Sequence, residues 1–483
     1  MQGVIQRTHF VGIGGTGMCG LAEILLTLDY AVSGSDLVTG TEAVERLERM
    51  GARIHAGHAA EYVRGSDLVV VSSAVGEENP EVCEARRLGL PVLLRGEMLA
   101  EIMRLKYGIA VAGAHGKTTT TSLIGHVLCE AGLDPTVIVG GRLRALGSNA
   151  RMGAGDIFVA EADESDGSFL QILPTVAVIT NIDREHLDHY GSLEKIRAAF
   201  LRFARGVPFY GVVVACGEDP HLRELLPEIN KPVVTYGRTD DCRVQLTSLV
   251  PTPRGSRFGV AADGRDLGEF AVPLPGIHNA LNALACVAVA LFLGVPAARI
   301  RETLGTFAGV ARRFELRGES HGVTVIDDYG HHPTEIAAVL RSAREVFPGR
   351  RLVVLFQPHR YSRTAALAAE FAQAFRDADL VLLSEIYAAG ETPLPGVTSA
   401  GLCDPIRRAS RVELEYVADE DRAIERCASI LGAGDVLITL GAGTVSQWGD
   451  RILARLGSPG CAASAVVEEQ CGARPGEPEG GGR

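Results

Sequence analysis

Short apolar runs alternate with segments of helical periodicity along most of this chain. In the first part, the apolar runs predict strands at residues 8–13, 30–34, 67–72 and 91–94. Segments in which apolar residues recur every three or four positions predict helices at residues 17–28, 42–50, 80–88 and 96–103. Strands that alternate with helices in this way indicate a parallel sheet with helices on its faces.

The alternation continues in two further parts of the chain. The second part predicts strands at residues 107–112, 157–160 and 176–180, and helices at residues 122–129 and 276–293. Within it, residues 244–274 form short strands separated by Gly/Pro turns, which predicts an antiparallel appendage. The third part predicts strands at residues 323–327, 352–356, 380–384 and 436–440.

These patterns predict an α/β protein, and a length of 483 residues fits about three domains. We expect a Rossmann-like N-terminal domain at residues 1–106 and a P-loop-type central domain at residues 107–313. A Rossmann-like C-terminal domain is expected at residues 314–456. Residues 457–483 are rich in Gly, Pro, Ala and Glu without periodicity, which predicts a disordered tail.

Composition and charge narrow the class of protein. Hydrophobic residues make up 46% and charged residues 22% of the chain, which is ordinary for a globular protein. A net charge of −12 argues against a general nucleic-acid binder. The ten cysteines form no CxxC pair and no metal-binding spacing, which is typical of reduced thiols. Without a signal peptide or a run of about 18 apolar residues, we expect a cytoplasmic protein with no membrane span.

The clearest chemical motif is Gly113-Ala114-His115-Gly116-Lys117-Thr118-Thr119, between a predicted strand and a helix-forming segment. Glycines let the backbone approach a phosphate, and N–H groups at a helix start point toward the anion. Lys117 would neutralise β- and γ-phosphate charge, and the Thr118 hydroxyl would ligate Mg²⁺. Val111 stands where the strict G-x-x-x-x-G-K-[ST] pattern has its first glycine, so this loop is a shorter variant. A glycine turn with an unrelated lysine is the alternative.

Two other strands of the second part end in groups that suit a metal ion. One runs into Glu161, and the other is followed by His186. Because the carboxyl ends of neighbouring parallel strands share one sheet edge, both side chains are expected to converge on residues 113–119, which we call the phosphate loop. A carboxylate and an imidazole, with phosphate oxygens and waters, make a plausible Mg²⁺ site. The later acids Glu164 and Asp166 fit a solvated turn better than Glu161 does.

The first predicted strand is followed by another glycine-rich turn, Gly12-Ile13-Gly14-Gly15-Thr16-Gly17. Asp36 ends the next strand, about 20 residues further on, as in dinucleotide-binding folds. NAD is one interpretation, but a UDP-sugar also carries a pyrophosphate that such a turn can bind. Ser72 and Ser73 end another strand at the edge where ligands of α/β proteins bind, although an ordinary turn is equally consistent.

Polar clusters later in the chain suit a purine and a carboxylate. His278 and Asn279 open a predicted helix and could hydrogen-bond a purine edge, although Asn279 also fits a plain N-cap. In the third part, residues 327–333 follow a strand, and so does a second cluster that contains Arg360 and Arg363. Two arginines three positions apart suit a carboxylate and a phosphate, although they also fit a surface turn.

Taken together, these motifs resemble the Mur ligases of peptidoglycan synthesis over residues 7 to about 456. The resemblance rests on residues 12–18, 113–119, 161–165, 181–188, 278–282, 312–314, 328–333 and 359–363. The glycine-rich first turn and the Tyr-Gly-His-His-Pro stretch are typical of the alanine-adding branch. Other members carry a carbamylated lysine where Phe200 stands here, and this branch is expected to lack it. Ala114 replaces a commoner threonine, with little expected consequence because the loop backbone binds the phosphate.

The resemblance implies ATP-dependent amide formation, in which UDP-N-acetylmuramate becomes an acyl phosphate that L-alanine attacks. It implies ATP and Mg²⁺ as cofactors, no nucleic-acid or membrane partner, and a monomer or homodimer. The implied catalytic residues are Lys117, Glu161, His186 and Arg360. The implied ATP-binding residues are Gly113, Ala114, His115, Gly116, Lys117, Thr118, Thr119, His278, Asn279, Asn282 and Arg312.

The remaining implied roles concern the metal and the other two substrates. Thr118 and Glu161 would hold one Mg²⁺, and His186 a second. The UDP part would be bound by Gly12, Gly14, Gly15, Thr16, Gly17, Asp36, Ser72 and Ser73. L-Alanine and the muramoyl carboxylate would be bound by Tyr329, His331, Arg360 and Arg363.

Three other functions remain open from the sequence. A murein-peptide recycling ligase shares nearly every motif but joins a preformed tripeptide. An NAD-dependent oxidoreductase built on the first domain would leave the Lys117 loop without a purpose. A nucleotide-gated regulator would bind ATP without turnover, and it would not need the carboxylate-suited residues of the third domain.

Overall fold

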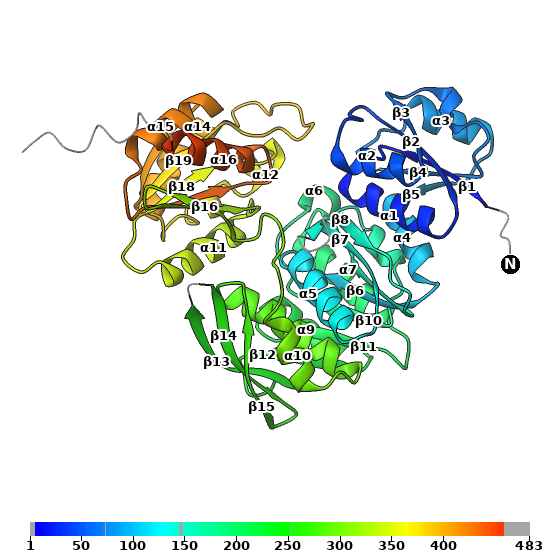
Figure 1. Cartoon of the computed structure of the whole chain (residues 1–483), viewed down its shortest axis with the longest axis horizontal. Helices are drawn as coiled ribbons and strands as arrows, with labels where there is room; N and C mark the ends of the chain where they lie inside the picture. Colours follow the sequence, from blue (N-terminus) through cyan, green and yellow to red (C-terminus); the bar gives the residue numbers. More distant parts are fainter. Residues whose placement is uncertain (1–4, 73, 144–147, 253, 458–483) are drawn as a thin grey trace, which may run out of the picture.

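A computed structural model of the chain describes residues 5–72, 74–143, 148–252 and 254–457. Three α/β lobes follow one another along the chain, each built on its own sheet (Figure 1). The first lobe lies at the upper right of Figure 1, the central lobe at the bottom and the third at the upper left. Residues 458–483, which belong to the predicted disordered tail, lie outside the described residues.

The first lobe has a five-stranded sheet in the order β3-β2-β1-β4-β5, and all neighbouring strands are parallel. Its strands are β1 (Arg7–Val11), β2 (Ala31–Asp36), β3 (Arg53–Ala56), β4 (Leu68–Val71) and β5 (Val92–Leu94). Its helices are α1 (Thr16–Thr27), α2 (Glu42–Arg49), η1 (Ala60–Val63), α3 (Pro80–Arg87) and α4 (Arg95–Met103). Phe10 and Val11 of β1 belong to separate apolar clusters on opposite faces of the sheet. Because helices cover both faces, the inner strands are continuous apolar runs.

The central lobe has a ten-stranded sheet in the order β15-β14-β13-β12-β11-β10-β6-β9-β7-β8. Its first strands are β6 (Tyr107–Ala112), β7 (Thr136–Leu143), β8 (Ser148–Arg151), β9 (Ile157–Glu161) and β10 (Val176–Ile179). They are followed by β11 (Val212–Cys216), β12 (Val233–Gly237), β13 (Val244–Thr252), β14 (Gly255–Ala262) and β15 (Arg265–Val272). The predicted antiparallel unit is present as β13, β14 and β15, and it is joined to the main sheet because β13 pairs with β12.

Helices surround this central sheet. They are α5 (Lys117–Glu130), η2 (Ser168–Gln171), α6 (Leu187–Tyr190), α7 (Leu193–Arg205), α8 (Pro220–Leu225), η3 (Leu226–Glu228), α9 (Ile277–Phe292) and α10 (Ala297–Leu304). The helix predicted at residues 122–129 begins earlier, at Lys117, because Gly116 adopts a left-handed conformation that ends the loop there. The phosphate loop is therefore joined directly to a helix N-terminus.

The third lobe has a six-stranded sheet in the order β16-β17-β21-β18-β19-β20, in which only β16 is antiparallel. Its strands are β16 (Glu315–Ser320), β17 (Val323–Asp328), β18 (Leu352–Phe356), β19 (Leu380–Leu383), β20 (Glu413–Tyr416) and β21 (Val436–Leu440). Its helices are α11 (Pro333–Val346), α12 (Tyr361–Ala366), α13 (Ala368–Phe371), α14 (Ser399–Ser410), α15 (Glu420–Ile430) and α16 (Val445–Leu456).

The predicted α/β class with three lobes is confirmed, and the predicted inner strands are present. The sequence analysis missed β3, β8, β16 and β20, each of which lies at the edge of its sheet. In β3, β16 and β20, partial exposure gives a mixed rather than a continuous apolar pattern. It also missed β7, β11 and β12, which lie inside the central sheet. Among the residues described, no helix is both long and apolar enough to cross a bilayer.

The lobes differ in how they are joined. One continuous apolar cluster runs through the first and central lobes, and α1 packs against β7 and β8. The third lobe has its own two clusters, one on each face of its sheet. Polar contacts link its α11 to the central lobe, as in domains that move relative to one another.

Candidate active site

The phosphate loop lies at the carboxyl end of β6 and requires glycine at two positions. Gly113 has φ +132°, and a Cβ there would lie 2.1 Å from Thr180 Oγ1. Gly116 has φ +81°, and its Cβ would lie 2.5 Å from Asn282 Oδ1. Any side chain would therefore displace the loop from the strand tip or from α9.

Lys117 is held inside a ring of acceptors. Its Nζ donates to the Gly113 carbonyl at 2.6 Å and to Glu164 Oε1 at 2.8 Å. Burial alone would lower the pKa of Lys117, but the charges of Glu164, Asp163 and Glu161 outweigh it and raise the pKa. The lysine is therefore a permanent positive charge within the loop that is expected to bind phosphate.

Acidic groups of the neighbouring strands surround this lysine because β6 lies between β9 and β10. Thr118 Oγ1 donates to Glu161 Oε2 at 2.9 Å. A second group of possible ligands comprises Glu164, Glu185 and His186, whose ligand atoms lie within 4.8 Å of one another. The structure thus brings Thr118, Glu161 and His186 to the same loop, as the strand ends predicted.

Glu164 differs from its prediction as part of a solvated turn. It is 2% exposed, and burial foremost raises its pKa to about 7 even though Lys117 opposes the shift. Within the described residues, its Oε2 and the Oε1 of Glu185 are buried without a hydrogen-bond partner, and the nearest cation to Glu185 Oε1 is Arg363 Nη2, at 3.8 Å. Buried carboxylate oxygens without donors fit a divalent cation, which prefers such ligands. Sequence analysis missed both acids as candidates, although each follows a strand closely.

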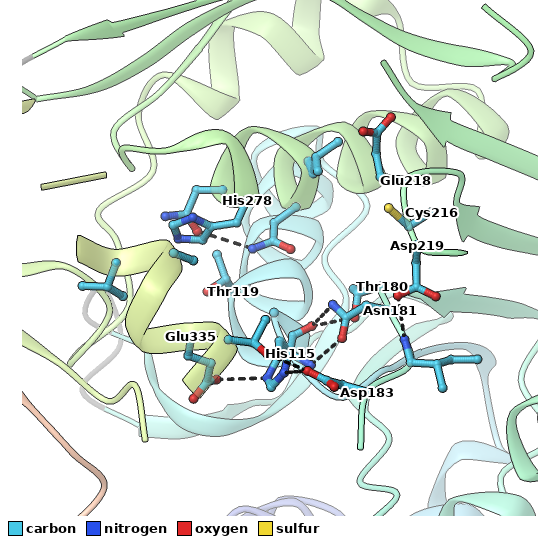
Figure 2. A pocket seen from close by; sticks show the side chains of 18 of the residues that line it. His115, Thr119, Thr180, Asn181, Asp183, Cys216, Glu218, Asp219, His278 and Glu335 are labelled. Carbon is cyan, nitrogen blue, oxygen red and sulfur yellow. Dashed lines mark hydrogen bonds and ion pairs between the residues drawn. The ribbon is translucent and has the colours of Figure 1, made fainter. Parts of the chain in front are cut away.

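A cavity of about 440 Å³ beside the loop is lined by His278, Asn279 and Asn282 of α9, and its far wall carries His115 and Asp183 (Figure 2). Burial lowers the pKa of His278 to about 4, so its ring is neutral near pH 7. A neutral ring and amides beside a phosphate loop suit the base and ribose of a nucleotide.

A second cavity, of about 690 Å³, lies on the other side of the loop and contains Lys117, Glu161 and His186. Arg312, predicted to face the nucleotide, lines this cavity and not the one beside His278. Arg312 Nε contacts Asp327 at 3.2 Å, whereas Arg313 lines both cavities. The sequence could not separate these adjacent arginines because both belong to one irregular turn.

The third lobe contributes basic groups at the edge of this second cavity. Tyr329, His331 and Arg363 line it. Arg360 and Arg363 also line an adjoining cavity of about 280 Å³ that contains His186 and Glu185. Arg363 Nη2 lies 3.8 Å from Glu185 of the central lobe, whereas Arg360 Nε lies 4.0 Å from Glu391 of its own lobe. Both guanidinium groups border this cavity, where an anionic substrate would bridge them.

The glycine turn of the first lobe is fixed to the end of β2. The Gly14 N–H donates to Asp36 Oδ2 at 2.8 Å, and a Cβ on Gly14 would lie 2.9 Å from that oxygen. Ser72 lies beside Gly12, as predicted for one sheet edge. Ser73 lies outside the described residues, as does the side chain of Thr16.

A polar cluster across the lobe boundary was not predicted. His115 Nε2 lies 2.9 Å from Asp183 Oδ2, which also accepts from Thr334 Oγ1 at 2.8 Å (Figure 2). His115 Nδ1 lies 3.5 Å from Glu335 Oε1. Burial lowers the pKa of His115, but Asp183 and Glu335 outweigh it and raise the pKa to about 10. The phosphate loop is thereby tied to α11 of the third lobe.

Three family models match consecutive parts of the chain. Residues 7–107 match the Mur ligase family catalytic domain, and residues 111–290 match the Mur ligase middle domain. Residues 312–443 match the Mur ligase glutamate ligase domain.

Similar proteins cover nearly the whole chain. The UDP-N-acetylmuramate–L-alanine ligase of Geobacter sp. (strain M21) is 51% identical over 94% of this chain and 99% of its own. That of Solibacter usitatus is 53% identical over 94% of this chain and 96% of its own. The crystal structure of the UDP-N-acetylmuramate-alanine ligase from Thermotoga maritima aligns with TM-score 0.79 and 32% identity, over 93% of this chain and 98% of that one. A murein peptide ligase from Psychrobacter arcticus aligns with TM-score 0.68 and 26% identity, over 96% of this chain and 100% of that one.

Proposed function

This chain belongs to the Mur ligase family, and on that premise we propose that it joins L-alanine to UDP-N-acetylmuramate with cleavage of ATP to ADP and phosphate. The observation that carries the proposal is identity of 51–53% to L-alanine ligases along 94% of the chain. The reaction would form the first peptide bond of the peptidoglycan precursor. Because its substrates are nucleotides, we propose that it takes place in the cytoplasm.

The site geometry supports a two-step reaction. The lactyl carboxylate of UDP-N-acetylmuramate attacks the γ-phosphorus of ATP, which gives an acyl phosphate and ADP. The amine of L-alanine then attacks the acyl carbon, loses a proton, and phosphate leaves. The first step brings several anionic oxygens together, and Lys117 offsets their repulsion from within the loop.

Residues of three lobes would hold the three substrates. Gly113 to Thr119 would bind the ATP phosphates, and His278, Asn279 and Asn282 the nucleoside. The first-lobe turn with Asp36 and Ser72 would bind the UDP part. Arg360 and Arg363 would hold the carboxylates of L-alanine and the muramoyl group beside the acyl phosphate. Enclosure between lobes aligns the substrates and protects the acyl phosphate from water.

Magnesium fits the acidic groups around Lys117. Thr118 and Glu161 would hold one ion, and His186 a second together with the buried carboxylates of Glu164 and Glu185. When bound, Mg²⁺ neutralises charge that develops on the transferring phosphoryl group. Phe200, the position of the carbamylated lysine in other members, is 1% exposed and packs on Phe169, so this chain offers no such group there.

One assay tests the proposal. Phosphate release would be followed with UDP-N-acetylmuramate, ATP and Mg²⁺, and with L-alanine, glycine, L-serine or a murein tripeptide in turn. We expect turnover with L-alanine and a requirement for Mg²⁺ that chelation abolishes. Turnover with the tripeptide alone would assign the recycling function instead, and ATP binding without turnover would indicate a regulator.

Arg360→Ala tests the third-lobe part of the site. We expect a raised KM for L-alanine or UDP-N-acetylmuramate by about tenfold or more, because a charge-assisted contact to a carboxylate is lost. The KM for ATP should stay unchanged. Unaltered rates at limiting L-alanine and limiting UDP-N-acetylmuramate would remove Arg360 from the site.

A further inference from the structure

The first lobe contains a buried polar cluster that the reaction does not use directly. Glu81, near the start of α3, is fully buried beneath the sheet formed by β1, β2 and β3. Its Oε2 accepts from His9 Nε2 at 2.7 Å and from Ser35 Oγ at 2.7 Å. Its Oε1 accepts from His58 Nδ1 at 3.0 Å and from the Ala59 N–H at 3.2 Å.

This carboxylate therefore joins three successive segments of the sheet. His9 lies on β1, Ser35 on β2, and His58 follows β3. His9 Nδ1 contacts Ser33 Oγ at 2.8 Å, so the ring of His9 is fixed at both nitrogens. A buried carboxylate that accepts hydrogen bonds at both oxygens fixes the positions of its donors. Moving any of these donors would leave negative charge without a hydrogen bond in a low-dielectric interior, which costs free energy.

The contact to Ser35 leads straight to the proposed UDP site. The Ser35 carbonyl accepts from the Gly12 N–H at 2.9 Å and from the Ile13 N–H at 3.0 Å. The next residue is Asp36, whose carboxylate accepts from Gly14. The tip of β2 thus holds the glycine turn, and the Ser35 hydroxyl fixes that tip to Glu81.

The segment that contains His58 meets the same strand tip. The Gly57 N–H donates to the Asp36 carbonyl at 2.8 Å, and Gly57 immediately precedes His58. Glu81 therefore holds Asp36 from both sides, through Ser35 before it and through the His58 segment after it.

We infer that Glu81 is a positioning residue for the UDP-sugar, which sets the glycine turn and Asp36 for substrate binding without touching the substrate. This inference rests on the proposed function of the first lobe. Specificity for the nucleotide sugar would then depend on a carboxylate on the opposite side of β2 from the ligand.

The test compares Glu81→Gln with Glu84→Gln on the same helix. The first keeps the side-chain volume, but its NH₂ group faces donors where a carboxylate oxygen stood. Glu84 is 9% exposed and pairs with Arg87 at 2.6 Å, away from the glycine turn, so it is a matched control. We expect Glu81→Gln to raise the KM for UDP-N-acetylmuramate about tenfold, with the KM for ATP and L-alanine within about twofold. Glu84→Gln should leave all three unchanged.

Equal changes in all three constants, or equal effects of both variants, would overturn the inference. If Glu81→Gln does not fold, Ser35→Ala decides, because it removes the contacts of the Ser35 hydroxyl with Glu81 Oε2 and His58 Nδ1 and leaves the carboxylate itself in place. A KM for UDP-N-acetylmuramate that is unchanged in a folded Ser35→Ala variant would likewise overturn it. Calorimetry measures the binding of UDP-N-acetylmuramate without turnover. Weaker binding of UDP-N-acetylmuramate to Glu81→Gln than to the unaltered chain would therefore support the inference even if the protein does not ligate L-alanine.

Discussion

The pair formed by Lys117 and Glu164 allows stability and activity to be separated. Lys117→Met keeps the apolar stem and removes the charge that the phosphate loop supplies. Among the described residues, Glu164, with a side chain 3% exposed, then keeps only His186 Nε2, at 3.7 Å, as a possible counterion. The substitution should abolish ATP-dependent phosphate release and also destabilise the central lobe.

The size of the destabilisation follows from burial. Removing one partner of a buried ion pair costs about 3–5 kcal/mol, because the other charge stays buried. The lower end applies here, since the Lys117 side chain is 12% exposed and Glu164, whose pKa is already raised to about 7, can take up a proton. For a lobe of this size, about 3 kcal/mol corresponds to a melting temperature lower by roughly 6–12 °C.

A second substitution tests whether the buried carboxylate of Glu164 causes the loss of stability. Glu164→Gln in the Lys117→Met background removes the stranded carboxylate, so it should restore most of the melting temperature and none of the phosphate release. Scanning calorimetry and the ligation assay measure the two effects on the same samples. An unchanged melting temperature in Lys117→Met, or a further fall in the double variant, would refute the buried pair. Ligation in either variant would refute the role of the loop.

Three other predictions concern separate parts of the molecule. Glu335→Gln should raise the KM for ATP roughly threefold to tenfold, because it loosens the contact of α11 with His115, and steady-state kinetics with an unchanged KM would contradict this. Phe200→Ala should lower the free energy of unfolding by about 3–5 kcal/mol, since the ring packs on Phe169 at 5.5 Å between centroids, and denaturant unfolding with a loss below about 1 kcal/mol would disagree. Burial raises the pKa of Glu81, but the hydrogen bonds to its carboxylate outweigh burial and lower the pKa. The carboxylate therefore stabilises the fold fully above about pH 4.3, the pKa of an unfolded glutamate, and this stabilisation is lost as the pH falls through the lower pKa of the folded state. The difference in melting temperature between the unaltered chain and Glu81→Gln should therefore become smaller in acid. A difference that becomes larger in acid would contradict the lowered pKa of Glu81.

Local chemistry was readable from the sequence. The turn at Gly113 and Gly116 was predicted because only glycine tolerates the backbone conformation and the close approach that such a loop needs. Glu161 and His186 were predicted to meet because parallel strands present their carboxyl ends at one edge. The apolar runs predicted most of the inner strands, since burial on both faces leaves a continuous pattern, but β7, β11 and β12 were missed.

The tertiary structure alone decided which charges neutralise one another. The order β10-β6-β9 places Glu164 against Lys117, 47 positions away, and so turns an apparent surface acid into a buried one. Packing of the third lobe likewise brings Thr334 to Asp183, 151 positions away. A sequence pattern indicates which residues of a short segment are buried in the core and which are exposed to solvent. The pairing of charges depends instead on distances between distant segments, which only the strand order and the packing of the lobes determine.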